Sequence, residues 1–451
     1  MDLKGFALES QDILADIKRF FASHTDAAPR GVPYDKILNT MAFWPEFYPY
    51  FMDFKFAPFG STSLDVPEFH KKNINKVVAE SSVADYQYNQ MSGRYDTRES
   101  IVKNFPEIKR FQEAGFQITS SNLYLSNGAI AGISSCIANL CKDVNDEVII
   151  FEPMYPFHLG QVISKKLALK SIRMNYNPTA NEFEIDYEGL RKALTPKSRV
   201  LILCNPNNPT TKVYTAEEYK KISEIIKDFP DLWVIEDSAY FLYHDDTHKP
   251  IPYPIVNPQD FNRTLTIYSG GKMYNVTGLR CGIIVGPAEF MGRLILTSVL
   301  ESQLATVFEQ SIIREDVVSA NEVYRNGKDF YEETRQDIVQ RGKRVAEELE
   351  KLGLKVAPVE GSYYLVAYLE SLRGKIDEKY YKKLDEKEEE TPELDKAFCR
   401  MLFSERKVGV MPMSQLYFGE NIPDNLVRIA VNRNDEQLDL FISSCKDLIK
   451  L

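Results

Sequence analysis

Four continuous apolar runs in the middle of the chain constrain its fold more than any other feature. They occupy residues 148–151, 200–204, 232–235 and 264–268, and helical patterns at 158–166 and 216–227 separate the first three. Thr215 precedes the second helical pattern and Glu218 follows three residues later, which is typical of a helix start. Apolar strands alternating with helices predict an α/β fold, with a mostly parallel central sheet and helices on both of its faces.

Each apolar run ends in a polar motif. The motifs are Glu152-Pro153-Met154-Tyr155, Asn205-Pro206-Asn207-Asn208-Pro209-Thr210, Glu236-Asp237-Ser238-Ala239-Tyr240 and Ser269-Gly270-Gly271-Lys272. Open α/β sheets bind their ligands at the carboxyl ends of the parallel strands. We therefore expect one binding site that brings these four motifs together.

The last motif places a lysine in a Gly-rich loop between two apolar runs, 264–268 and 281–285. Small residues allow a ligand to approach the backbone, and the Ser269 hydroxyl and the Arg280 guanidinium suit a phosphate. An amine held there can form a Schiff base with an aldehyde cofactor. These residues alone are equally consistent with a surface turn and a solvated Lys272.

A second candidate anion site follows the predicted strand at 123–125. Ser126-Asn127-Gly128-Ala129 leads from this strand into an apolar helix that reaches Leu140. The first turn of a helix presents free backbone N–H groups and the positive end of the helix dipole. By itself this motif is common, so it supports an anion site only in combination with the others.

Composition narrows the classes of protein to which the chain can belong. Its 451 residues predict two or three domains, and its net charge of −10 argues against a nucleic-acid surface. The six cysteines and five histidines are scattered, which predicts reduced thiols in a cytoplasmic protein and no metal site. No apolar run approaches the roughly eighteen residues of a membrane span, and the first residues show no signal-peptide pattern.

The remaining segments suggest three parts. Residues 1–75 hold a predicted helix at 10–23 and an aromatic, proline-containing segment at 42–51, and they form an arm and part of a smaller domain. Residues 76–325 form the large domain. Residues 326–451 form the rest of a smaller α+β domain, with helices up to 352, short strands near 356, 362–367 and 427–431, and a charged, solvated excursion at 370–396.

With Asn208, Asp237, Tyr240, Lys272 and Arg280 in this order, the chain resembles fold-type I pyridoxal-phosphate enzymes of the class I/II aminotransferase family. The resemblance extends from about Gly60 to the end. The run Thr277-Gly278-Leu279-Arg280-Cys281-Gly282 is similar to the kynurenine, glutamine and aromatic aminotransferases, although Leu279 stands where that subgroup often has an aromatic residue.

The resemblance implies roles around the cofactor ring. Lys272 would bind the cofactor aldehyde and then move the substrate proton, which requires an amine of lowered pKa. Asp237 would keep the pyridine nitrogen protonated. Asn208 and Tyr240 would hydrogen-bond the ring oxygen, and Tyr155 would stack on the ring.

The resemblance also implies the contacts that hold the phosphate and the substrate. Gly128, Ala129, Ser269 and Arg280 would bind the phosphate. Tyr88, five residues before Gly93, matches a tyrosine that reaches the phosphate of a neighbouring subunit, which implies a homodimer with a shared active site. The substrate α-carboxylate would bind Arg428 as a bidentate pair, and Gly60 would line the substrate pocket through its backbone.

Taken singly, most of these residues have ordinary structural explanations. Asp237 suits a helix N-cap, Asn208 suits a turn before proline, and Tyr155 suits a core position. Arg428 is harder to explain in this way, because an arginine inside an apolar strand needs a partner. One departure from the family pattern is Thr211, which stands where the family usually has glycine.

The function implied is transfer of an amino group from an L-amino acid to a 2-oxo acid by a ping-pong mechanism, with aromatic or large neutral donors favoured by the aromatic segment near 42–51. A carbon–sulfur β-lyase on the same fold is the alternative, and a non-catalytic cofactor sensor is disfavoured by the acidic charge. A dicarboxylic donor would need a second arginine in the pocket. Arg94, Arg98 and Arg314 are present in the chain, but the sequence does not place them.

Overall fold

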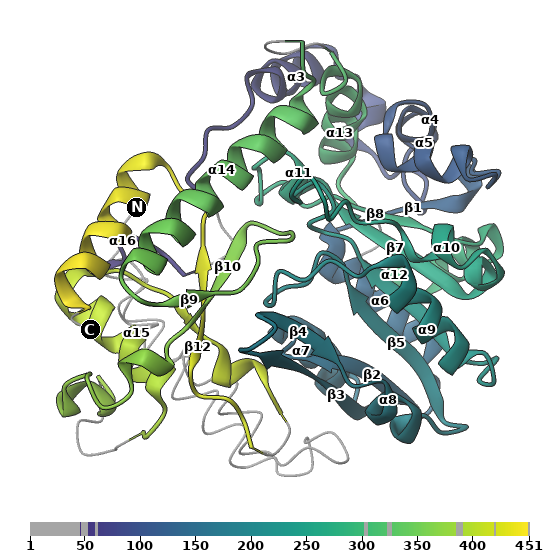
Figure 1. The fold of residues 1–451 in the computed structure, drawn as a ribbon. Coiled ribbons are helices and arrows are strands. Elements are labelled where there is room, and N and C mark those ends of the chain that lie inside the picture. The colour runs from purple at the N-terminus through teal and green to yellow at the C-terminus, as the bar shows by residue number, and fades with distance from the viewer. Residues whose placement is uncertain are drawn as a thin grey trace.

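The computed structural model of the protein describes residue 46 and residues 53–58, 62–301, 305–322, 327–384, 391–418 and 421–449 (Figure 1). The predicted helix at 10–23, the aromatic segment at 42–51 apart from Glu46, and Gly60 lie outside the described residues. Two sheets are present, one between residues 123 and 285 and one between residues 355 and 430.

The larger sheet has eight strands in the order β1-β8-β7-β6-β5-β2-β3-β4. Parallel pairing joins β3, β2, β5, β6 and β7, whereas β8 is antiparallel to both β7 and β1, and β4 is antiparallel to β3. The bounds are β1 Leu123–Ser126, β2 Glu147–Glu152, β3 Ala168–Asn177, β4 Glu182–Ile185, β5 Ser198–Cys204, β6 Trp233–Asp237, β7 Thr264–Ser269 and β8 Gly282–Val285. The predicted mostly parallel central sheet is confirmed.

Strands β3 and β4 were not predicted from the sequence. They form a hairpin at the sheet edge, where β4 alternates between exposed and buried side chains. A search for continuous apolar runs finds strands that are buried on both faces, and an edge hairpin lacks that pattern.

Helices cover both faces of this sheet, as predicted. Ile150 and Ile202 pack in a cluster with α6 (Gly128–Leu140), α7 (Pro156–Ser164) and α12 (Ala288–Glu301). Their neighbours Ile149 and Leu201 point to the opposite face, toward α5 (Pro106–Glu113), α8 (Tyr187–Ala193) and α9 (Ala216–Ile226). The start of α9 carries the predicted capping pair, because Thr215 N donates to Glu218 Oε2 at 2.8 Å and Glu218 N donates to Thr215 Oγ1 at 3.2 Å.

The smaller sheet is antiparallel, in the order β11-β12-β10-β9. Its strands are β9 Lys355–Val356, β10 Tyr364–Tyr368, β11 Met411–Pro412 and β12 Leu426–Ala430. Helices α14 (Phe330–Lys351), α15 (Leu394–Arg406) and α16 (Asp435–Leu448) lie around it, on the left of Figure 1. The predicted α+β region is confirmed. In the charged excursion, most described residues between 373 and 380 are exposed.

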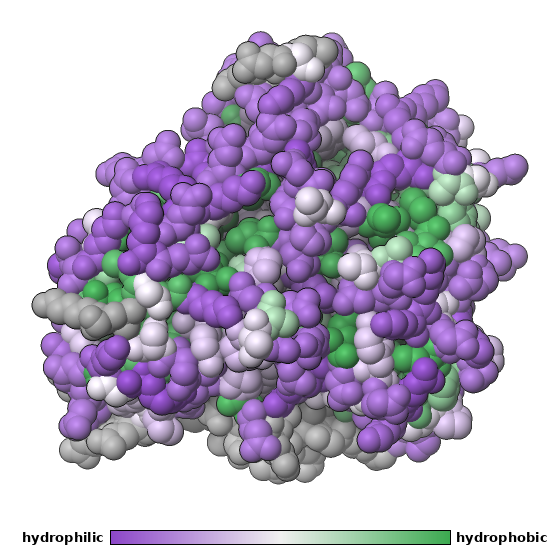
Figure 2. Space-filling model, in the orientation of Figure 1, coloured by the Kyte–Doolittle hydropathy of each residue, from purple (hydrophilic) through white to green (hydrophobic). Residues whose placement is uncertain are grey.

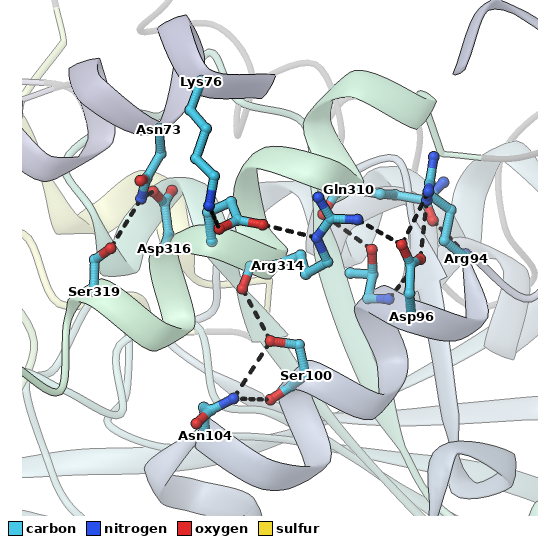
Figure 3. Close-up of polar contacts among 12 residues, drawn as sticks. Asn73, Lys76, Arg94, Asp96, Ser100, Asn104, Gln310, Arg314, Asp316 and Ser319 are labelled. Carbon is cyan, nitrogen blue, oxygen red and sulfur yellow. Dashed lines mark hydrogen bonds and ion pairs between the residues drawn. The ribbon is translucent and has the colours of Figure 1, made fainter. Parts of the chain in front are cut away.

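Polar contacts join three helices that are distant in sequence, α3 (Glu68–Ala79), α4 (Tyr95–Asn104) and α13 (Val307–Ser319) (Figure 3). Asn73 Nδ2 donates to Asp316 Oδ1 at 2.9 Å, and Lys76 Nζ lies 2.8 Å from Glu315 Oε2. Ser100 Oγ donates to the Arg314 carbonyl oxygen at 2.9 Å. Helices α3 and α4 are thereby both anchored to α13.

The face of the molecule in Figure 2 is mostly hydrophilic, with hydrophobic residues in small separate patches. Within the part of the chain that the structure describes, no helix has the length and apolar character to cross a membrane. The same residues contain no cluster of three or more potential metal ligands.

Candidate active site

A cavity lies at the carboxyl ends of the parallel strands, where the polar motifs meet. Its wall includes most of the residues expected from the sequence, together with four others. The lining residues are Ala129, Ile130, Ile133, Tyr155, Cys204, Asn208, Asp237, Ala239, Tyr240, Ser269, Lys272 and Arg280. Parallel strands bring the segments that follow them to one edge of the sheet, so residues from 129 to 280 share one cavity.

Lys272 lies in α11 (Gly270–Met273), the single helical turn that follows β7. Its Nζ atom donates a hydrogen bond to the Tyr363 hydroxyl at 2.6 Å and lies 5.7 Å from the centre of the Tyr240 ring. Burial lowers the pKa of Lys272, and the nearby charges of Arg428 and Arg280 lower it further. A lysine in this environment has an increased neutral, nucleophilic fraction.

Asp237 is the last residue of β6 and is 5 % exposed. Its Oδ2 atom lies 3.0 Å from Nε2 of His158, and its Oδ1 atom accepts the backbone N–H of Ala239 at 3.1 Å. His158 is buried in α7 and its ring lies edge-on to that of Tyr155. Sequence reasoning missed His158, because a histidine inside a helix 79 residues earlier carries no local sign of this contact.

Asn208 connects the cavity to the smaller sheet. Its Nδ2 atom lies 3.4 Å from the Tyr240 hydroxyl, and its Oδ1 atom accepts a hydrogen bond from Nη1 of Arg428 at 2.6 Å. Arg428 is 4 % exposed on β12, donates to the Pro58 carbonyl oxygen at 3.1 Å and lies 4.0 Å above the Tyr364 ring. Tyr364 was not predicted as a site residue either, although it belongs to the pair Tyr363-Tyr364 on a predicted strand.

The other end of the cavity is built around the start of α6. Gly128 has a φ of +80°, and a Cβ atom there would collide with the Arg280 guanidinium. Glycine is therefore required both for the backbone conformation and for the close approach of Arg280. Ala129 and Ser269 line the same cavity, so the α6 N-terminus, a hydroxyl and a guanidinium converge in the way that suits a phosphate.

Two guanidinium groups near Lys272, those of Arg280 and Arg428, have no carboxylate partner in the part of the chain that the structure describes. Among the described residues, neither Arg280 nor Arg428 has a carboxylate oxygen within 4.0 Å, although most other arginines do. Arg428 is buried, and its two recorded hydrogen-bond acceptors, Asn208 Oδ1 and Pro58 O, are neutral. A buried guanidinium without a counter-ion favours an anionic ligand.

Residues 57–444 match the family described as "Aminotransferase class I and II". The chain belongs to this family. Its members are pyridoxal-phosphate enzymes, and the protein is a pyridoxal-phosphate-dependent aminotransferase that acts on amino acids and 2-oxo acids. The named relatives are aminotransferases, which does not favour the β-lyase alternative.

Individual relatives are distant but match over most of their length. The aminotransferase is 26% identical over 399 residues to the probable kynurenine–oxoglutarate transaminase of Saccharomyces cerevisiae, covering 86% of this chain and 85% of the relative. It is 26% identical over 365 residues to the aspartate aminotransferase of Rhizobium meliloti, covering 79% and 80%. The solved N-succinyldiaminopimelate aminotransferase of Mycobacterium tuberculosis has a TM-score of 0.75 at 23% identity, covering 88% and 94%, which supports fold type I.

The cavity fits pyridoxal phosphate. It offers an amine at Lys272, a carboxylate at Asp237, and the anion-binding group of Gly128, Ser269 and Arg280. An aldehyde, a ring nitrogen and a phosphate each find a chemically suitable partner in this set. Arg428 lies beyond Asn208, on β12 of the smaller sheet.

Four expected site residues are not among those that line this cavity: Gly128 and Arg428, which contact the lining residues Arg280 and Asn208, and Tyr88 and Gly60. Tyr88 is 78% exposed and does not line it, and Gly60 lies outside the described residues. The side chains of Val83, Tyr86 and Tyr95 are also largely exposed, so Tyr88 belongs to a short stretch of uncovered hydrophobic residues. An uncovered group of this kind is typical of a surface that meets another protein.

Thr211 adopts a φ of +67°, a left-handed conformation that is unfavourable for a β-branched residue and natural for glycine. Its Oγ1 atom donates to the Pro358 carbonyl oxygen at 3.0 Å, and its own carbonyl accepts the Gly361 N–H at 2.9 Å. The hydroxyl thus adds a contact that glycine could not make. The threonine ties the Asn208 loop to the segment that precedes β10.

The three arginines considered for a dicarboxylic substrate have partners elsewhere. Arg94 pairs with Asp85 and Asp96, and Arg314 pairs with Asp96 at 2.5 Å, as Figure 3 shows in part. Arg98 donates to the Ser120 and Gly93 carbonyl oxygens. None of the three lines the cavity.

Proposed function

We propose that this aminotransferase takes its amino group from an aromatic or other large neutral L-amino acid and passes it to a 2-oxo acid by a ping-pong mechanism. The observation that carries this proposal is the buried guanidinium of Arg428, which bonds to the cavity residue Asn208 and can bind one carboxylate. Arg94, Arg98 and Arg314 are committed to other partners, so they offer no charge for a second carboxylate. Tyrosines 240, 363 and 364 provide an apolar surface near the amine.

In this proposal Lys272 binds the cofactor and carries the substrate proton. When bound, pyridoxal phosphate supplies an aldehyde for this amine and a ring that accepts the electron pair left at the substrate α-carbon. Burial lowers the pKa of Lys272, which gives an amine that can accept a proton and release it again within one cycle.

Asp237 orients and polarises the cofactor ring. Its carboxylate is held by His158 and by the Ala239 N–H, which fix its position at the end of β6. Tyr155 lines the cavity next to His158 and would stack on the ring. The Tyr240 hydroxyl and Asn208 would donate hydrogen bonds to the ring oxygen.

Arg428 fixes the substrate. Its planar guanidinium can bind an α-carboxylate through two parallel hydrogen bonds, and Asn208 limits its rotation. The backbone near Gly60 would form the adjacent wall. At the opposite end, Gly128, Ala129, Ser269 and Arg280 would hold the phosphate and leave the substrate side open.

We further propose a homodimer in which Tyr88 of each chain reaches the phosphate site of the other. Its 78% exposure supports that role, and so does the fact that it does not line the cavity of its own chain. The test mixes inactive Lys272→Ala and Tyr88→Ala chains, because a mixed dimer then regains one complete site. Recovery of activity only after mixing is expected, and a Tyr88→Ala chain that remains fully active would contradict the shared site.

The six cysteines are free and buried, which supports a reducing, cytoplasmic location. Fractionation of cells that produce the protein would test this location. We also retain residues 1–75, 76–325 and 326–451 as the proposed arm, large domain and smaller domain. The two separate sheets support the boundary between the last two.

The decisive experiment adds single amino acids to the purified protein without an acceptor, and follows the visible absorbance of the bound cofactor. Phenylalanine, tryptophan and methionine should shift the band at concentrations at least tenfold lower than aspartate, and a 2-oxo acid should restore it. A shift at lower concentration with aspartate would contradict the proposed donor class. Pyruvate or ammonia released while the band persists would indicate elimination.

Lys272→Ala provides the control for the chemistry. This variant should lose both the lysine-linked absorbance band and turnover. Lys109→Ala, which removes an exposed lysine on α5, should retain both.

A further inference from the structure

We propose that Tyr363 is a positioning residue that receives the amine of Lys272 whenever that amine leaves the cofactor, and directs it toward the substrate α-carbon. This inference rests on the proposed transamination. Transamination requires that the same lysine first bind the cofactor covalently, then be released, and then carry a proton. A long, flexible side chain needs a defined position during the released phase.

The geometry supplies such a position. Lys272 Nζ donates to the Tyr363 hydroxyl oxygen at 2.6 Å, within the distance of a strong hydrogen bond. The nitrogen also lies 5.3 Å from the centre of the Tyr363 ring. Tyr363 is 2% exposed, so little water competes for the amine.

The backbone around Tyr363 is tied on one side to the segments that follow β5 and β6, and on the other to the residue that follows β12. Gly361 N donates to the Thr211 carbonyl at 2.9 Å, and Ser362 N donates to the Tyr243 carbonyl at 2.8 Å. On the other side, Val431 N donates to the Tyr363 carbonyl at 2.9 Å. These bonds prevent the phenol from moving away from the lysine turn.

Neighbouring rings also fix the orientation of the phenol. The Tyr363 ring lies edge-on to Tyr240, with centroids 5.0 Å apart and an interplanar angle of 90°, and 5.2 Å from Tyr243. The Tyr243 hydroxyl donates to the Lys272 carbonyl oxygen at 2.6 Å. One tyrosine therefore holds the backbone of Lys272 and the next holds its amine.

The chemistry is consistent with a fixed acceptor rather than a proton carrier. Burial raises the pKa of Tyr363 well above that of a free phenol, so its hydroxyl stays protonated. A neutral lysine amine gives one N–H to the Tyr363 oxygen and keeps its lone pair. That lone pair would take the proton from the substrate α-carbon, and the resulting ammonium would hold this proton until it is returned; pyridoxal phosphate, when bound, would accept the electron pair left at the α-carbon.

Tyr240 also faces the amine, but through its ring and not through its hydroxyl. Tyr240 presents its ring, and its hydroxyl lies 3.4 Å from both Asn208 Nδ2 and the Tyr364 hydroxyl. The charged and titratable groups that influence Lys272 are Tyr364, Arg428, Arg280 and Asp237. All of them remain unchanged when only the Tyr363 hydroxyl is removed.

The test compares Tyr363→Phe with Tyr253→Phe. Tyr253 is also fully buried, but its hydroxyl donates to Asp260 Oδ2 at 2.7 Å and it does not line the cavity. For both variants we would measure kcat, KM, the isotope effect of an α-deuterated donor, and thermal stability. A fifth measurement is the pH dependence of the rate at which cofactor-free enzyme recaptures pyridoxal phosphate, which reports on the amine without turnover.

Tyr363→Phe should lower kcat about tenfold, as expected from the loss of one buried hydrogen bond, and change KM less than twofold. The isotope effect should increase, and the midpoint of the pH profile for recapture should fall. Tyr253→Phe should change none of these while losing comparable thermal stability. Wild-type kcat and recapture in Tyr363→Phe would overturn the positioning role, whereas a wild-type enzyme that transaminates no donor would overturn the proposed function instead.

Discussion

Arg428 Nη1 donates a hydrogen bond to Asn208 Oδ1 at 2.6 Å, and this contact joins the smaller sheet to the loop that follows β5 of the larger one. The two residues are 220 positions apart in the sequence. Because Asn208 also lies 3.4 Å from the Tyr240 hydroxyl, the proposed substrate contact and the proposed cofactor contact share one side chain. A change at Arg428 should therefore weaken substrate binding strongly and cofactor binding to a smaller extent.

Arg428→Lys should lower kcat/KM for the amino-acid donor about a hundredfold, equivalent to roughly 3 kcal/mol. Lysine keeps the charge but loses the planar pair of donors that matches a carboxylate. Steady-state kinetics with a saturating 2-oxo acid would measure the effect. Arg344→Lys on the surface of α14, where the arginine pairs with Asp435 at 3.6 Å, is the matched control. An unchanged donor KM in Arg428→Lys would exclude the proposed carboxylate contact.

His158→Phe should weaken cofactor binding about ten- to one-hundredfold, because a buried hydrogen bond to a carboxylate is lost while the ring contact with Tyr155 is kept. Titration of the cofactor into cofactor-free protein, followed by absorbance, would measure the dissociation constant. His248→Phe removes a more exposed histidine that lies 2.9 Å from Asp245, and it should bind the cofactor normally. Equal affinity in the two variants would mean that His158 does not orient Asp237.

Glu236 should make folding stability depend on pH. Burial raises its pKa from 4.5 to about 7, although hydrogen bonds from Tyr219, Tyr253 and Thr266 oppose the shift. The folded state therefore holds this proton more tightly than the unfolded state. The contribution of Glu236 to the free energy of unfolding is therefore complete below pH 4.5. It is lost as the pH rises through about 7, and the total loss is about 3 kcal/mol.

Glu236→Gln should remove that dependence, so the difference in unfolding free energy between this variant and wild type should change between pH 5 and pH 8. Urea unfolding at several pH values would measure it. Glu217→Gln, an exposed change at the start of α9, should alter the pH profile far less, because solvent screens the ion pair of Glu217 with Lys220. If the unfolding free energies of wild type and Glu236→Gln changed with pH in parallel, the Glu236 carboxyl would not bind a proton more tightly in the folded state.

Thr211→Val should destabilise the fold by about 1 kcal/mol, because valine keeps the unfavourable φ but loses the hydrogen bond to Pro358. Thr211→Gly should cost less, since it also relieves the backbone strain. Urea unfolding at one pH would rank the variants. Thr179→Val, in an exposed turn, is the control. A valine variant more stable than the glycine variant would mean that the positive φ carries little strain.

Much of the fold could be predicted because its pattern is local. Strands β2, β5, β6 and β7 appear as continuous apolar runs, and the capping pair of α9 lies within four residues. The edge strands β3 and β4 could not be found in this way, because alternating exposure resembles that of many surface segments. Strands near residues 356, 362–367 and 427–431 were predicted, but their pairing was not, because pairing depends on contacts between segments that are distant in the sequence.

The sequence by itself determined which chemistry-bearing residues follow each strand, and parallel pairing then places them at one edge. Only the tertiary structure decided the partners of those residues. His158 meets Asp237 across 79 residues, and Lys272 meets Tyr363 across 91. Side-chain periodicity reports which face of an element is buried, but contacts between elements depend on strand order and packing. The tertiary structure therefore decided that Arg428 lacks a carboxylate partner among the described residues, whereas Arg94 and Arg314 have them.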